Sequence, residues 1–228
     1  MAQAGIHGLL SIAVRKWVPS KEWLILGFVL GNILPDMDAL AVAYATLTGL
    51  DTHGLHRTFS HSLIVILGMS VMIYLISAVL KRPRLGNLAV GLGIGMAMHA
   101  LLDLLIWFRG VEIFWPFFGE VNFWRGVTMP TWWYNKFESA IEFFLFALFF
   151  VVLAKLARKQ GTDISFLKQL KIWTRVQIAL FVIFLVVVFA WDRYFIIYGA
   201  LYILSLGLAI GITIRMRKTI DGLNINTG

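Results

Sequence analysis

Apolar residues fall into long uninterrupted runs along this chain, and the length of each run predicts a helix that crosses a membrane. A spanning helix needs about 20 predominantly apolar residues. Five runs approach that length, at roughly residues 62–80, 86–107, 137–154, 176–191 and 194–214. The last two follow each other closely, so they predict a C-terminal helical hairpin.

Polar residues interrupt a further apolar segment near the N-terminus. Residues 21–50 are apolar except around Pro35 and two aspartates, and we predict a membrane helix broken at Pro35, because proline lacks a backbone donor. Such a break is tolerated at membrane depth only inside protein or beside a wet cavity. Residues 4–18 are too short to span and predict a half-inserted or interfacial helix that carries His7 inward. The whole pattern predicts an all-α, polytopic membrane protein with about six membrane helices.

Composition supports this fold class and narrows the chemistry. Hydrophobic residues make up 60% of the 228 positions, charged residues 14%, and the mean hydropathy is +0.83, which is more apolar surface than a soluble domain of this size can bury. The chain has no cysteine, so any metal ion must be held by imidazole and carboxylate groups. The first apolar run lacks the flanks of a cleavable signal peptide, and we expect the N-terminus to be retained.

The formal net charge of the chain is +8, and its basic residues are distributed as the membrane topology predicts, without the clustering expected of a nucleic-acid-binding groove. Fifteen of the 20 basic residues lie on one face, which the positive-inside rule makes cytoplasmic, together with the C-terminus. We expect anionic lipids as partners of these residues and no nucleic acid. Nine of the 12 acidic residues and all five histidines lie toward the other face. The predicted site is therefore on the extracytoplasmic side of a plasma (inner) membrane.

Candidate ligands are confined to the first two thirds of the chain, which predicts three parts. Residues 1–154 form a site-bearing, hydrolase-like membrane domain, residues 155–175 a basic cytoplasmic linker, and residues 176–228 a transmembrane hairpin and tail without candidate ligands.

Histidines and aspartates gather in three short segments, NILPDMD at 32–38, HRTFSHS at 56–62 and HALLD at 99–103. Ionisable groups at membrane depth are costly and mark functional sites. His99 and Asp103 are four residues apart, so they share a helix face and can bind one metal ion; a hydrogen bond that serves only helix packing is the alternative. Asp36 and Asp38 need a cation nearby, either a metal ion or Arg57.

The candidate roles follow from these spacings. We predict Asp36, His61, His99 and Asp103 as metal ligands, with Asp38, His56, His7 and Glu142 as further candidate ligands. Asp38 is a ligand or a general base, and Arg57 clamps an oxyanion in a bidentate manner. His53 is left out because its neighbours are typical of an ordinary loop.

Two other patterns are structural. Gly91 and Gly95 predict a small-xxx-small packing face inside a membrane helix. The aromatic residues between Trp107 and Tyr134 are typical of a membrane interface and predict a lipid-facing lid.

The motifs as a set resemble a known family. An N-terminal histidine, Leu-Pro-Asp-x-Asp, His-Arg-x-x-x-His-Ser, His-x-x-x-Asp and a later Trp-Pro-Phe are similar to motifs of the membrane-bound metal-dependent hydrolase family, also described as LexA-binding, inner membrane-associated hydrolases, over roughly residues 4–150. The resemblance implies a bacterial-type plasma-membrane protein with a hydrolytic metal centre built on Asp36, Asp38, His56, His61, His99 and Asp103.

A fainter similarity runs to the superfamily of zinc-dependent phospholipases C and single-strand nucleases, helical proteins that hold a zinc cluster. The comparable positions in this sequence are His7, Asp36, His61, His99, Asp103, Glu138 and Glu142. Glu138 departs from that pattern, which has a histidine there.

The expected function is hydrolysis of a phosphoester or other ester of a lipid or membrane-proximal small molecule, through water activated by one or two divalent metal ions, zinc being the expected one. Two alternatives stay open. A metal- or proton-coupled transporter would need a polar relay toward the cytoplasm, and the sequence shows none. A non-catalytic membrane adaptor with a structural metal would need a coordinatively closed site. The sequence leaves the substrate and the oligomeric state open.

Overall fold

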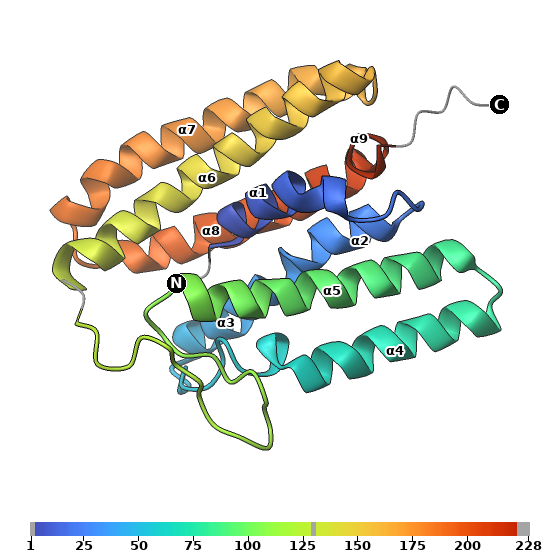
Figure 1. Ribbon diagram of the computed structural model, residues 1–228. Helices are drawn as coiled ribbons and strands as arrows, with labels where there is room; N and C mark the ends of the chain where they lie inside the picture. Colours follow the sequence, from blue (N-terminus) through green and yellow to red (C-terminus); the bar gives the residue numbers. More distant parts are fainter. Residues whose placement is uncertain (1–2, 129–130, 223–228) are drawn as a thin grey trace.

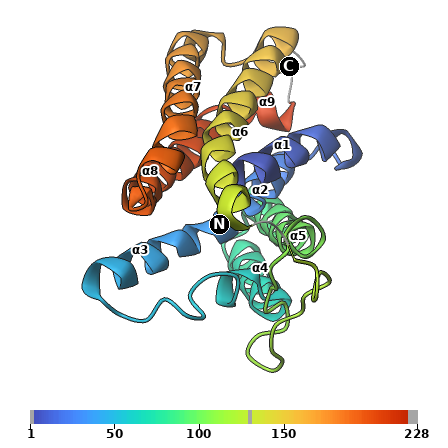
Figure 2. The ribbon, with the colours of Figure 1, turned by 90° about the vertical axis from the view of Figure 1, so that its left-hand side faces the viewer.

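The computed structural model describes residues 3–128 and 131–222, and the side chains of Trp132 and Trp133 in the aromatic run lie outside the described part. The described helices are α1 (Ala4–Val14), α2 (Leu24–Gly31), α3 (Ala39–Thr48), α4 (Leu63–Val79), α5 (Pro83–Ile106), α6 (Thr131–Gln160), α7 (Leu167–Ala190), α8 (Tyr194–Arg215) and α9 (Arg217–Asp221). Figures 1 and 2 show two groups of long helices, α6 with α7 and α8, and α4 with α5, on either side of α1 and α2. The all-α prediction is confirmed.

Four of the described helices are long and apolar enough to cross a membrane, namely α5, α6, α7 and α8. The pair α2 and α3 makes a fifth candidate span, bent by 46°. The predicted number of about six spans is therefore slightly too high. The difference is α4, whose 17 residues extend about 26 Å at 1.5 Å per residue, less than the roughly 30 Å of a hydrocarbon core.

The helix break predicted at Pro35 is present. α2 ends at Gly31, a 3-10 turn follows at Leu34–Asp38, and α3 continues at the 46° angle. In a continuous α-helix the ring of Pro35 would collide with the carbonyl of Gly31, and Pro35 has no N–H to donate. The break leaves the carbonyl of Asn32 facing α5, where it accepts a hydrogen bond from His99.

Glycines allow the backbones of α2 and α5 to approach closely beside this break. A Cβ atom on Gly95 would lie 3.0 Å from the backbone nitrogen of Asn32 and closer still to the carbonyl oxygen of Phe28. A Cβ atom on Gly91 would lie 2.8 Å from the backbone nitrogen of Phe28. Both distances are below ordinary van der Waals contact, so the predicted packing role of Gly91 and Gly95 is confirmed.

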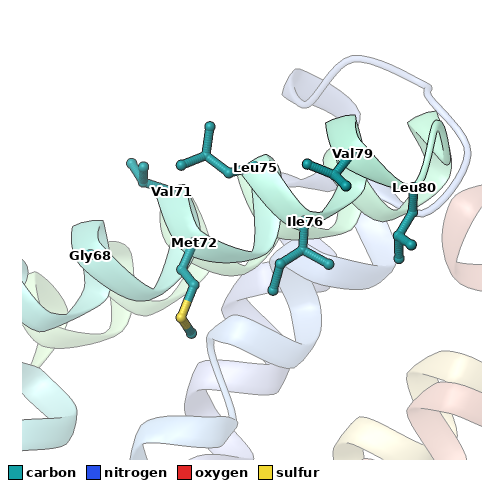
Figure 3. A pocket seen from close by; sticks show the side chains of 7 residues that line it. All are labelled: Gly68, Val71, Met72, Leu75, Ile76, Val79 and Leu80. Atoms are coloured by element: carbon teal, nitrogen blue, oxygen red, sulfur yellow. The ribbon is translucent and has the colours of Figure 1, made fainter.

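α1 and α4 differ in their exposed surface. α1 is 11 residues long, too short to span, and it buries His7 and Ser11 completely. α4 instead presents an apolar groove on its outer side (Figure 3), lined by Gly68, Val71, Met72, Leu75, Ile76, Val79 and Leu80. No charged side chain lines this groove, and such a face suits contact with lipid chains.

The C-terminal helices pack on α6 through one large apolar core. Phe184 of α7 and Tyr198 of α8 both contact the ring of Phe143 on α6, with ring centroids 5.1 and 5.7 Å apart. The region predicted as a basic linker is mostly helical, because α6 continues to Gln160 and α7 begins at Leu167. The division of the chain into three parts stays a prediction.

Candidate metal centre

Five buried ionisable side chains from four separate segments meet beside the break between α2 and α3. They are His7 of α1, Asp36 of the 3-10 turn, His61 of the turn Phe59–His61, and His99 and Asp103 of α5. Each has at most 1% of its surface exposed. The three motif segments and the N-terminal histidine therefore come together in space, as predicted.

The ring of His99 is fixed by the helix break. Its Nδ1 donates to the carbonyl oxygen of Asn32 at 2.8 Å, so in the neutral ring Nε2 carries a free lone pair. That nitrogen lies 3.1 Å from Nε2 of His61 and 3.6 Å from Oδ1 of Asp36. The backbone of one broken helix thus selects which nitrogen of His99 faces the cluster.

The ring of His61 is fixed in the same way by the loop that precedes α4. The hydroxyl of Ser60 donates to Oδ2 of Asp38 at 2.9 Å, so its oxygen is left to accept from Nδ1 of His61, also at 2.9 Å. Nε2 of His61 then carries the free lone pair. Burial lowers the pKa of His61, which favours the neutral imidazole that binds metal ions.

Two lone pairs that face each other at 3.1 Å repel unless a proton or a metal ion lies between them. Two imidazoles on one tetrahedral zinc ion, with bonds of about 2.0–2.1 Å, have nitrogens about 3.3 Å apart. Both oxygens of Asp36 are buried without a hydrogen-bond partner. One donor atom from each of Asp36, His61 and His99 lies within 4.8 Å of the others. This donor set of two nitrogens and a carboxylate fits a divalent metal ion.

A second group of three residues shares His99 with the first. His7, His99 and Asp103 also bring one donor atom each within 4.8 Å of one another. Nε2 of His7 lies 3.0 Å from Oδ1 of Asp103, Nδ1 of His7 has no hydrogen-bond partner, and the rings of His7 and His99 stack 3.8 Å apart. Because His99 offers one free lone pair, the two groups cannot each bind a separate ion through it.

Arg57 enters the cluster from the same loop as His61 but pairs with an unexpected carboxylate. Its Nε lies 3.1 Å from Oδ2 of Asp103 in an ion pair, and both Nε and Nη1 are buried without a hydrogen-bond partner. The residue has a φ of 63° and is 4% exposed. The alternative in which its guanidinium pairs with the two aspartates near Pro35 is wrong, since the partner is on α5.

Asp38 lies behind His61, outside both donor groups. Its carboxylate interacts with Nδ1 of His56 at 2.8 Å and accepts from the backbone N–H of Arg57 at 3.1 Å and from Ser60. These are the contacts of a group that orients an imidazole from outside. His56 lies farther out, with 24% of its side chain exposed, and it is absent from both groups.

Glu142 is fully buried on α6 but is also in neither donor group. Its Oε1 accepts from the backbone N–H of Gly5 at 2.8 Å, in the first turn of α1. An acidic group there accepts a hydrogen bond from a helix N–H that has no partner within the helix, and its negative charge interacts favourably with the helix dipole. Glu142 therefore positions α1 and, two residues along, His7. Glu138 is nearly buried one turn away, and His53 lies exposed in the loop after α3.

Sequence reasoning missed two contributors to the centre. The Asn32 carbonyl is a backbone group, and the only available signal was its position just before the break at Pro35. Ser60 was not among the predicted site residues, yet it links Asp38 to His61. Its position beside His61 in the HRTFSHS segment is the signal that could have identified it.

A family model described as "YdjM inner membrane protein" matches residues 3–195 of the chain, which is most of its length. No curated protein and no solved structure matches it. The match contains every candidate ligand and ends at the start of α8.

Proposed function

The chain belongs to the YdjM inner membrane protein family, and from that premise we propose that it is a metal-dependent hydrolase that cleaves a phosphoester or other ester of a lipid or membrane-proximal small molecule. The family and the apolar helices make it a multi-pass protein of the inner membrane. The proposal adds an extracytoplasmic site and a cytoplasmic C-terminus, both from the distribution of basic residues.

The observation that carries the proposal is the pair of imidazole nitrogens on His61 and His99. They face each other at 3.1 Å while each ring's other nitrogen has a hydrogen-bond partner, and the carboxylate of Asp36 beside them has no hydrogen-bond partner. Three buried donors held in this way by neighbouring groups are typical of a prearranged metal site. The group supplies three protein ligands, so a four-coordinate ion would keep one position open for water or substrate, as a catalytic site requires.

A divalent ion bound there would act as a Lewis acid on the ester or phosphoester. The other residues of the cluster are arranged to bind an anion next to it. The guanidinium of Arg57 is buried, oriented by Asp103 and left with Nη1 unpartnered, so it can donate to a phosphoryl or carbonyl oxygen. Because the site is almost completely shielded from water, such a contact is stronger than on a surface.

Asp38 supports this arrangement from outside the centre. It holds His61 through Ser60 and, by accepting from the backbone N–H of Arg57, it fixes the residue that carries the guanidinium. One carboxylate therefore orients both a candidate ligand and the candidate anion clamp. We assign Asp38 as a positioning residue of the proposed site, in place of the ligand or base expected from spacing.

Elemental analysis of the detergent-purified protein tests the proposal first. Wild type should contain stoichiometric divalent metal, zinc above all, and His99→Ala and Asp36→Ala should lose it while remaining monodisperse. His53→Ala removes an exposed histidine and is the matched control, which should keep the metal. Wild type without metal after reconstitution, or His99→Ala with full metal content, would refute the metal centre.

Hydrolysis is tested separately, with the metal-loaded wild type and phospholipid vesicles or soluble phosphoesters as substrates. Release of product that is lost in Arg57→Ala at unchanged metal content supports the hydrolase. Stoichiometric metal without hydrolysis of any ester would refute the hydrolase and favour the alternative of a membrane adaptor with a structural metal.

A further inference from the structure

The loop between α5 and α6 exposes an unusual density of aromatic side chains beside the candidate metal centre. Its described residues, 107–128, fold back on themselves, because Val111 and Val121 exchange two backbone hydrogen bonds of 3.0 and 2.9 Å. Between these residues, at the tip of the loop, Phe117 is 72% exposed and Phe118 69% exposed. We call the aromatic residues Phe114, Trp115, Phe117 and Phe118 the aromatic tip.

The base of this loop is anchored in the protein, so the tip does not hang freely. Val111 is fully buried and Ile113 is 3% exposed, and both pack against Leu104 near the end of α5. The tip is therefore held in place by buried neighbours on one side while its aromatic rings point away from the core. Exposed aromatic rings on a fixed support are typical of a surface that binds something apolar.

The same loop is joined to the segment that carries the anion clamp. The backbone N–H of Glu112 donates to the carbonyl of Arg57 at 2.9 Å, the N–H of Leu63 donates to the carbonyl of Ile113 at 2.9 Å, and the hydroxyl of Ser62 donates to the carbonyl of Trp115 at 2.7 Å. We call residues 57–62 the strap. These hydrogen bonds connect both ends of the strap to the loop that bears the aromatic tip.

The exposed surface around the tip continues into the membrane-facing surface of the protein. α5, a candidate span, ends directly before the loop, and on its last turns Leu101 and Leu105 are 48% and 57% exposed. Phe59 of the strap is 59% exposed and makes an edge contact with Trp115 at a centroid distance of 6.1 Å. Aromatic rings at the end of a spanning helix belong to the headgroup layer of a bilayer.

We propose that the aromatic tip inserts into the lipid headgroup layer of the surrounding bilayer and thereby ties the strap, with Arg57, to that layer. This inference rests on the proposed hydrolase function. The substrate class is then a phospholipid, whose phosphate reaches Arg57 from the membrane surface and not from the aqueous phase. The hydrogen bonds of Arg57 and Ser62 to the loop, together with that of Leu63, hold the strap beside the tip, so insertion of the tip places Arg57 close to the headgroup layer.

The absence of cysteine from the whole sequence makes the insertion directly measurable. A nitroxide is attached to Phe118→Cys in vesicles of phosphatidylethanolamine and phosphatidylglycerol, and its collisions with oxygen and with a water-soluble nickel chelate are compared. Leu67→Cys on α4, where the native side chain is 66% exposed, gives the lipid reference. Lys159→Cys, at the exposed basic end of α6, gives the water reference. The label at 118 should resemble the lipid reference. A label at 118 that resembles the water reference overturns the proposal.

The link to substrate is tested with the double variant Phe117→Asp and Phe118→Asp, at a metal content equal to that of wild type. Its hydrolysis of vesicle phospholipid should fall by about tenfold or more, since it loses the burial of two aromatic rings in lipid, while hydrolysis of a soluble short-chain phosphoester stays unchanged. Equal loss on both substrates overturns delivery from the membrane. If wild type hydrolyses neither, the hydrolase function fails, and the nitroxide measurement still decides whether the tip is inserted.

Discussion

Substitution Gly95→Ala tests how closely the candidate metal centre depends on backbone packing between α2 and α5. The added Cβ atom would lie 3.0 Å from the backbone nitrogen of Asn32, whereas ordinary contacts begin at 3.4 Å. The two helices must therefore separate by at least 0.4 Å there, the difference between those two distances, and by more at the carbonyl of Phe28. Overpacking of this kind costs about 1–3 kcal/mol of stability.

The separation also acts on the candidate site. The bond from His99 Nδ1 to the Asn32 carbonyl, 2.8 Å in the native protein, lengthens as α2 moves away from α5. Sites of this kind tolerate displacements of about 0.5 Å, and loss of a group that orients a ligand weakens metal binding by about 10- to 100-fold. We expect Gly95→Ala to bind zinc about tenfold more weakly and to unfold at a lower temperature in detergent.

The matched control is Gly207→Ala in α8, where an added Cβ atom meets no atom within 4 Å. Alanine in an open helical position should stabilise the protein by about 0.5–1 kcal/mol. Thermal unfolding and zinc titration of the two variants side by side give the comparison. If Gly95→Ala matches the control in both measurements, the inference that close packing of α2 holds His99 in place is refuted.

Further predictions follow from the contacts of three single side chains. Asp38→Asn should weaken metal binding by about 10- to 100-fold without removing a ligand, because the carboxylate no longer orients Ser60 and, through it, His61. Complete loss of metal, as in a ligand variant, would contradict the positioning role. Glu142→Ala should destabilise the protein by about 1–3 kcal/mol, since the N–H of Gly5 is left buried and unpaired, whereas Glu142→Gln should retain most of the stability in thermal unfolding. Burial raises the pKa of Asp221 above 3.8, so the folded state favours its protonated form, and stability should fall as pH rises from about 4; Asp221→Asn should show a flatter profile over that range, and an unchanged slope would disprove the assignment.

The helical class and the motif segments were predictable from sequence because they depend on local composition and spacing. Runs of apolar residues at membrane length leave few alternatives to helices, and the proline in the apolar segment before α3 had to interrupt it. The four-residue spacing of His99 and Asp103 placed both on one side of α5. None of these features depends on which helices are neighbours in the folded protein.

The choice between Asp36 and Asp38 was not predictable in this way. The two residues are separated by one position in a 3-10 turn, and the direction of each carboxylate depends on the loop before α4, which packs there only in the folded protein. The role of Glu142 has the same origin, since its partner Gly5 is 137 residues away in the sequence. The predicted number of spans was too high because the apolar run at residues 62–80 forms a helix of only 17 residues, Leu63–Val79.

The long separation between the residues of the cluster has a consequence for biogenesis. His7 and Asp103 are 96 residues apart in the sequence, so at 5–20 residues per second a ribosome needs about 5 to 20 s to supply the partner after α1 has been made. During that interval α2 is already available to contact α1, but His7 lacks its carboxylate partner Asp103. Complete docking of α1 must wait for α5, and then for Glu142 on α6. A nascent chain that stalls before α5 lacks His99 and Asp103, so it has neither the complete candidate metal centre nor the buried partner of His7.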